Sequence, residues 1–220
     1  MLTFRLSNGP PCRIPARAIS GRRSDLVDRY YRRPLPDSGP NPFQCQGFVR
    51  NGTIANAGGE PLPIETLPPF LRALLVTDGT VTKALEAYFW EPVVVDTLRQ
   101  EFIVAADEIP WIAVKPQDQV LVREALLRGS DTGKHYAQAF SVIRTALIPS
   151  SFRERLINRE IGIGVLIRDS GLESFREVME VGVEPEPIEG ARALYRTYRI
   201  IIDGRPVILI SETFPLELYL

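Results

Sequence analysis

The stretch YRTYRIIIDGRPVILISETF, residues 195–214, decides the fold class of this chain. Asp203 and Gly204 separate two runs rich in β-branched residues, and an Asp-Gly pair in that setting is a strong signal for a two-residue hairpin turn. On the second expected strand, Glu212 has the parity of Ile208 and Ile210 and therefore shares their face. A carboxylate on an apolar face is costly to bury unless it is paired or hydrogen-bonded. Glu212 is therefore expected either at the mouth of a ligand site or where the strand reaches solvent.

The remaining segments predict class α+β, with a single antiparallel β-sheet and helices packed on one side of it. Further strands are expected over residues 92–104, 119–127 and 137–144. Helices are expected over residues 68–75, 81–89, 152–158 and 165–170. Residues 175–181 fit a strand by composition and a helix by period, so both stay open. The strands come in hairpins without regular βαβ crossovers, which favours the antiparallel arrangement.

Composition excludes several classes of function. The chain has 220 residues and a net charge of −1, which gives no overall attraction to nucleic acid or to an acidic membrane. No apolar run approaches the roughly 20 residues that span a bilayer. Cys12 and Cys45 are the only cysteines, so a reducing, cytoplasmic location is expected. His135 is the only histidine, which excludes a histidine-rich metal site; it lies in a polar run that is typical of a loop.

The first 60 residues differ from the rest of the chain. They contain many arginines and prolines and little sustained apolar periodicity. We interpret residues 1–60 as a largely irregular N-terminal extension and residues 61–220 as the folded domain. A transit peptide and a nucleic-acid-binding arm are the alternatives for a basic N-terminus, but transit peptides usually lack so many prolines.

Arg99 is the second ionisable residue on an apolar stripe, because it has the parity of Val93, Val95 and Ile103 on its expected strand. Arginine pairs with a carboxylate through two hydrogen bonds and stays charged at physiological pH. One interpretation is a buried salt bridge between Arg99 and Glu212. The other is a pocket in which Arg99 binds a substrate carboxylate and Glu212 accepts a hydroxyl or a proton.

Two glycine turns lead into expected helices, at residues 78–83 and 162–164. A helix N-terminus presents unpaired backbone N–H groups that can bind an anion, although ordinary turn chemistry explains either loop by itself. The Gly-x-Gly at 162–164 lacks the third glycine and the βαβ unit of a dinucleotide site.

The order of these motifs resembles the chorismate lyase (chorismate–pyruvate lyase) family, in its divergent archaeal, cyanobacterial and actinobacterial branch. The resemblance spans about residues 65 to 217 and rests on an ordered set of segments: 74–83 (LLVTDGTVTK), 95–102 (VDTLRQEF), 122–127 (VREALL), 161–162 (IG) and the hairpin ending in SETF. It implies an antiparallel sheet with helical flaps over an internal, water-excluded ligand cavity. It also implies cofactor-free conversion of chorismate to 4-hydroxybenzoate and pyruvate, which quinone or glycolipid pathways could consume.

Residues carried over from the resemblance define the expected site. Arg99 matches the arginine that binds the ring carboxylate, and Glu212 matches the glutamate near the ring hydroxyl. Val81 and Ile161 fall where the family uses backbone groups of the flaps to contact the ligand. The candidates for neutralising the enolpyruvyl carboxylate are Arg123, Lys83 and Arg196. No metal, nucleic acid or membrane is expected as a partner, and the chain is expected to be a monomer or a small homo-oligomer.

Two alternatives share the fold. The first is a non-catalytic, effector-sensing domain of a transcriptional regulator, since a fold does not determine a function. Such regulators normally carry an N-terminal winged helix-turn-helix, for which residues 1–60 are too rich in proline. The second is a catalytically inactive homologue, against which the presence of both Arg99 and Glu212 argues.

Overall fold

A computed structural model describes residues 52–56, 61–158, 162–184 and 192–220 of the chain. The C-terminal hairpin forms as predicted. Strands β7 (Ala193–Ile202) and β8 (Arg205–Pro215) pair antiparallel, with Ile202 opposite Arg205. Asp203 and Gly204 have φ angles of 50° and 70°, the left-handed values that a type I′ turn requires at both central positions.

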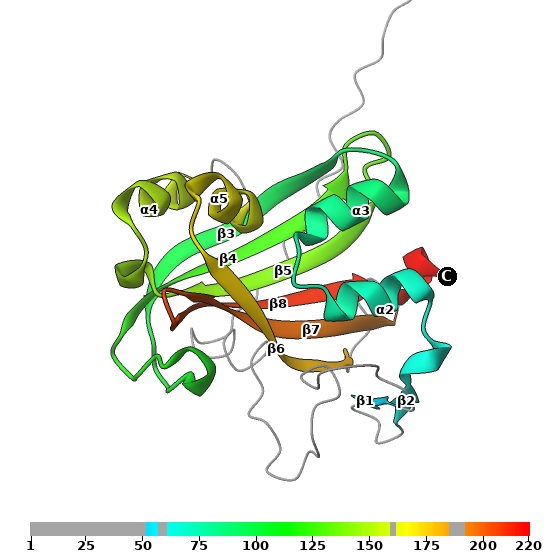
Figure 1. Ribbon diagram of the computed structural model, residues 1–220, viewed down its shortest axis with the longest axis horizontal. Coiled ribbons are helices and arrows are strands. Elements are labelled where there is room, and N and C mark those ends of the chain that lie inside the picture. The colour runs from blue at the N-terminus through cyan, green and yellow to red at the C-terminus, as the bar shows by residue number, and fades with distance from the viewer. Residues whose placement is uncertain (1–51, 57–60, 159–161, 185–191) are drawn as a thin grey trace, which may run out of the picture.

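All strands of the described chain join one sheet of eight, in the order β2-β1-β6-β7-β8-β5-β4-β3 (Figure 1). The other six strands are β1 (Thr53–Asn56), β2 (Leu62–Pro63), β3 (Val93–Val104), β4 (Gln119–Gly129), β5 (His135–Ile143) and β6 (Ser174–Val183). Every pair is antiparallel except β1 with β6. The predicted α+β class is therefore confirmed, and residues 175–181, for which strand and helix were both open, belong to strand β6.

The α-helices of the described chain lie over the same face of the sheet (Figure 1). They are α2 (Pro69–Val76), α3 (Val81–Phe89), α4 (Ser150–Ile157) and α5 (Ile163–Ser170). One apolar cluster packs under α2 and α3 and includes Leu71 and Leu85, and a second packs under α4 and α5 and includes Phe152 and Leu166. A third cluster covers the opposite face, where the β3–β4 connection contributes Ile112. Two separate cores on the helical face leave room for a site between them.

The predicted domain boundary near residue 61 leaves out one strand of the sheet. Ala55 of β1 pairs with Gly182 of β6, so the sheet includes residues 53–56. The rest of the predicted extension, with Cys12 and Cys45, lies outside the described residues, and its proposed character stays a prediction. Within the described ranges no helix is long and apolar enough to cross a membrane. Nor does any cluster of three or more histidine, cysteine, aspartate or glutamate side chains there have metal-binding geometry.

Glu91, between α3 and β3, anchors the tip of the β4–β5 hairpin. Its carboxylate accepts hydrogen bonds from the Tyr136 hydroxyl and from the backbone N–H groups of Asp131 and Thr132, at 2.9 and 3.0 Å for the latter two. The hydrogen bond from Tyr136 is the main reason why the pKa of Glu91 is lowered to about 2. This contact holds the end of α3 against the sheet.

Candidate active site

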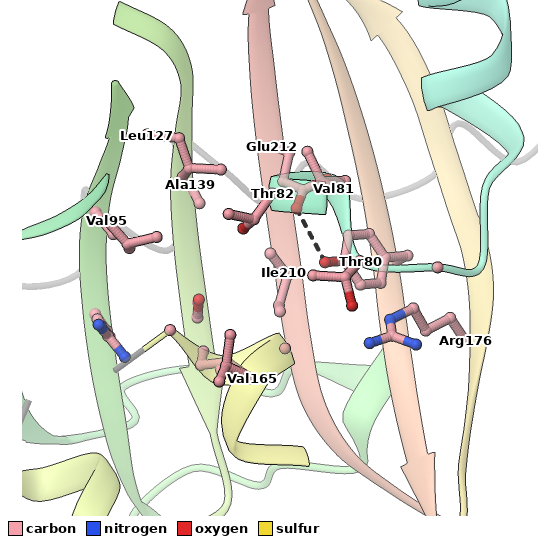
Figure 2. A pocket seen from close by; sticks show the side chains of 18 residues that line it. Thr80, Val81, Thr82, Val95, Leu127, Ala139, Val165, Arg176, Ile210 and Glu212 are labelled. Atoms are coloured by element: carbon pink, nitrogen blue, oxygen red, sulfur yellow. Dashed lines mark hydrogen bonds between the residues drawn. The ribbon is translucent and has the colours of Figure 1, made fainter. Parts of the chain in front are cut away.

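A pocket lies between the sheet and the N-terminal ends of α3 and α5 (Figure 2). The open space there is about 610 Å³, which includes the solvent at the mouth of the pocket. Residues 79–82 and 162–165 form its roof. The sheet side is formed by Val95, Arg123, Ala125, Leu127, Ala139, Ser141, Arg176, Tyr198, Ile210 and Glu212.

The pocket is hollow because its central strand carries small side chains. Ala139 and Ser141 of β5 face the cavity, and Ala125 lies opposite Ala139 on β4. Ile143, two residues after Ser141 on the same face, instead packs into the core under α4 and α5. The change from isoleucine to serine and alanine along one strand therefore separates the filled core from the cavity.

Two flaps close the pocket, and both present a helix N-terminus to it. The first flap is residues 77–89, with Thr80 as the N-cap of α3, and the second is residues 162–170, with Gly162 as the N-cap of α5. Thr80 makes no side-chain cap bond to α3, and Gly162 has no side chain that could cap α5. N–H groups of the first helical residues, such as those of Val81 and Ile163, are therefore available to a ligand oxygen. The flaps meet closely: a Cβ added at Gly164 would lie 3.2 Å from Thr80 Cγ2. The expectation of helical flaps over an internal cavity is confirmed.

Glu212 is buried inside this pocket, on the face of β8 that also carries Ile210, as its parity predicts. Its two oxygens accept hydrogen bonds from Arg196 Nε at 2.9 Å and from the Tyr198 hydroxyl at 3.1 Å, the latter drawn in Figure 2. Burial and the charge of Glu212 raise the pKa of Tyr198, so this hydroxyl stays protonated and donates. A carboxylate has about four lone-pair sites, and a ligand hydroxyl can occupy one that these two donors leave.

Arg196 is the ion-pair partner of Glu212, rather than Arg99. It is fully buried directly opposite Glu212 on β7. Its Nη1 donates to the carbonyl oxygens of Leu74 and Thr77, the latter at 2.9 Å, at the end of α2 and the start of the first flap. Arg196 thus neutralises Glu212 and ties it to the chain that leads into α3.

The prediction that Arg99 shares a face with Val95 and Glu212 is wrong. Strand β3 has a β-bulge at Leu98: Thr97 pairs with Ala125, and Arg99 already pairs with Glu124. The extra residue reverses the parity of the strand, as bulges do. Arg99 therefore points to the other face of the sheet, where it is ion-paired with Glu101 and outside the pocket lining.

The other sequence candidates fall in different places. Arg123 lines the pocket, is 2% exposed, and donates from Nη2 to Thr97 Oγ1 at 2.8 Å. Val81 lines the pocket at the start of α3 and is buried. The side chain of Lys83 is 64% exposed and ion-paired with Glu86 on the outside of α3. Ile161 lies outside the described residues, one position before the second flap.

Comparison with known proteins now bears on this site. Residues 75–220 match the family model of the chorismate pyruvate-lyase Rv2949c-like proteins. The chain belongs to this family. A chorismate pyruvate-lyase of Mycobacterium leprae is 32% identical over 160 residues, covering 69% of this chain and 76% of that protein. A chorismate pyruvate-lyase of Mycobacterium tuberculosis is 26% identical over 156 residues, covering 66% of this chain and 78% of that one. Among solved structures, PhnF from Mycobacterium smegmatis matches with a TM-score of 0.49 at 12% identity, over 64% of this chain and 66% of that one.

Two pocket residues of this chorismate pyruvate-lyase family member were not singled out from the sequence. Tyr198 has the parity of Arg196 on β7, but the pairing of β7 with β8 shifts by one residue between Ile200 and Ile201, so a count from the turn would have placed it on the wrong face. Arg176 lies on β6 at the side of the pocket, in the segment whose secondary structure was ambiguous, so no face could be assigned to it. Arg123 has the parity of Leu121, Ala125 and Leu127, which is the same signal that identified Glu212.

Proposed function

We propose that this chain is a cofactor-independent lyase that converts chorismate to 4-hydroxybenzoate and pyruvate. The observation that carries the proposal is the pair of buried ionic residues, Arg123 and Glu212, on either side of a floor of small side chains. Their strands, β4 and β8, are separated only by β5, so the two backbones are about 10 Å apart at about 4.8 Å per strand. A six-membered ring with a carboxylate at one end and a hydroxyl at the other fits across that distance.

In this proposal Arg123 takes the ring carboxylate, the role that sequence reasoning gave to Arg99. A buried guanidinium pairs strongly with a carboxylate because its planar fork matches the two oxygens. Glu212 accepts a hydrogen bond from the hydroxyl at the far end of the ring. The flap N–H groups, at Val81 on α3 and at the start of the second flap, face the ligand from above.

The reaction needs orientation more than a strong catalyst group. The hydrogen on the hydroxyl-bearing carbon leaves as a proton, and its electron pair forms a ring double bond. The neighbouring carbon–oxygen bond breaks, and the departing enolpyruvate takes up a proton and tautomerises to pyruvate. Aromatisation drives these steps, so fixing the ring and excluding water are the main tasks of the protein. Because Glu212 is already held by Arg196 and Tyr198, we assign it to orienting the hydroxyl.

The test is conversion of chorismate by the purified full chain, with both products quantified. Equal amounts of 4-hydroxybenzoate and pyruvate are expected from the wild type. Arg123→Met should reduce kcat/KM by about 100-fold or more, because a charged pair to the substrate is lost from a buried site. Arg99→Met is the matched control on the opposite face of the sheet and should retain near wild-type turnover.

Three outcomes would contradict the proposal. They are an absence of products, a different hydroxybenzoate isomer, and equal losses in the two arginine variants. Tight binding of 4-hydroxybenzoate without turnover would instead indicate the effector-sensing alternative. A cytoplasmic location and use of the product in quinone biosynthesis belong to the same proposal.

A further inference from the structure

Arg176 is a cation at the pocket whose charge is not balanced within the described chain. It lies on β6, opposite Ile200 of β7, and its side chain points toward the pocket beside Thr80 (Figure 2). No carboxylate of the described residues lies within ion-pair distance of it. By contrast, Arg196 and Arg199 on the neighbouring strand are both ion-paired with glutamates.

The hydrogen bond that Arg176 does make connects it to the first flap. Its Nη1 donates to the carbonyl oxygen of Asp78 at 2.6 Å, just before α3 begins. A guanidinium has five N–H donors, so this bond leaves others that can reach a ligand. Arg176 therefore contacts both the flap and the space that the flap covers.

The order of the strands gives Arg176 a specific position along a bound chorismate, which rests on the function proposed above. Arg123 is on β4, the small side chains are on β5, Glu212 is on β8, Tyr198 is on β7 and Arg176 is on β6. In chorismate the enolpyruvyl ether is attached to the carbon next to the hydroxyl-bearing carbon. With the ring carboxylate at Arg123 and the hydroxyl at Glu212, the enolpyruvyl group can extend past Glu212 toward β7 and β6.

We propose that Arg176 binds the enolpyruvyl carboxylate and holds the first flap closed over it. Arg196 does not serve that role, because it is already committed to Glu212 and to the carbonyl groups of the first flap. The substrate is a dianion and the aromatic product a monoanion, so Arg176 distinguishes one from the other. Release of pyruvate removes the anion beside Arg176 while the aromatic product stays at Arg123 and Glu212.

The test compares how Arg176→Gln changes the KM for the substrate and the inhibition constant of the product. Loss of a hydrogen-bonded charge pair should raise KM for chorismate by about 10- to 100-fold. The inhibition constant of 4-hydroxybenzoate, which lacks the second carboxylate, should change by less than about threefold. Arg176→Lys should recover part of the KM effect, because it restores the charge without the fork. Arg199→Gln, on the other face of β7, is the control and should change neither constant.

The outcomes separate this inference from the proposed function. If wild type converts chorismate but Arg176→Gln keeps the wild-type KM, or weakens substrate and product equally, Arg176 does not bind the second carboxylate. If the wild type neither converts nor binds chorismate, the proposed function itself fails. Unchanged product inhibition in the variant also shows that the protein is folded.

Discussion

Replacing Arg196 with methionine should destabilise the fold by about 3–5 kcal/mol, because it leaves Glu212 buried without its counter-ion. The variant also removes the donor to the carbonyl groups of Leu74 and Thr77, each worth about 1 kcal/mol. Since a domain of this kind is stable by about 5–15 kcal/mol, the loss is a large fraction of the total. Chemical unfolding in urea, followed by circular dichroism, measures it directly.

The matched control for this prediction is Arg199→Met on the same strand. Arg199 is ion-paired with Glu177 on the opposite face, but both side chains are partly exposed, at 26% and 32%. Removing such a pair costs at most about 1 kcal/mol, and the lost hydrogen bond from Arg199 to the Trp111 carbonyl oxygen costs about 1 kcal/mol more, so the total stays below that of Arg196→Met. The double variant Arg196→Met with Glu212→Leu should recover most of the lost stability, because no unpaired charge stays buried. Equal costs for Arg196→Met and Arg199→Met, or a double variant less stable than either single variant, would refute the reasoning.

Two further predictions concern the flaps and the hairpin tip. Gly164→Ala places a methyl group 3.2 Å from Thr80 Cγ2 and should weaken 4-hydroxybenzoate binding by about 1 kcal/mol, measured by calorimetry. Gly162→Ala is the control, because its added Cβ meets Val95 at an ordinary 3.5 Å, and it should weaken binding less. A larger effect of Gly162→Ala than of Gly164→Ala would contradict the flap contact. The pKa of Glu91 is lowered to about 2 from 4.5, so its contribution to stability is complete above 4.5 and is lost as pH falls toward 2. Wild type should therefore lose more unfolding free energy between pH 5 and pH 3 than Glu91→Gln, and parallel losses would show that Glu91 is not the group responsible.

Glu212 and Arg99 show how far alternation along a strand can be used. Glu212 was placed correctly because its face was counted from Ile208 and Ile210 on the same strand, without any irregularity between them. Arg99 was placed wrongly because the bulge at Leu98 reverses the count, and nothing in the local sequence VDTLRQEF marks that extra residue. Registers that depend on a bulge are determined by pairing with the neighbouring strand, which the sequence does not display.

The partners of the buried charges lie beyond such counting. The turn at Asp203 and Gly204 by itself would place Arg196 opposite Ser211, and only the irregularity between Ile200 and Ile201 brings it opposite Glu212, so this pair could not be derived from the turn. Arg123 could have been preferred over Arg99, because its parity with Leu121 and Ala125 is unbroken. Arg176 could not have been placed in the same way. Helices α4 and α5 separate β6 from β5 in the chain, so the sequence does not show that β6 pairs with β7.

Binding of the hydroxybenzoate isomers tests the central claim most directly, namely that one ring lies between Arg123 and Glu212. In the proposed binding mode the two side chains come from strands on either side of β5, so the hydroxyl lies opposite the carboxylate on the ring. We predict that 4-hydroxybenzoate binds the wild-type chain about 10- to 100-fold more tightly than 3-hydroxybenzoate or benzoate, as expected for one hydrogen bond to a charged group. Equal affinities for the three ligands, or a preference for 3-hydroxybenzoate, would contradict the account.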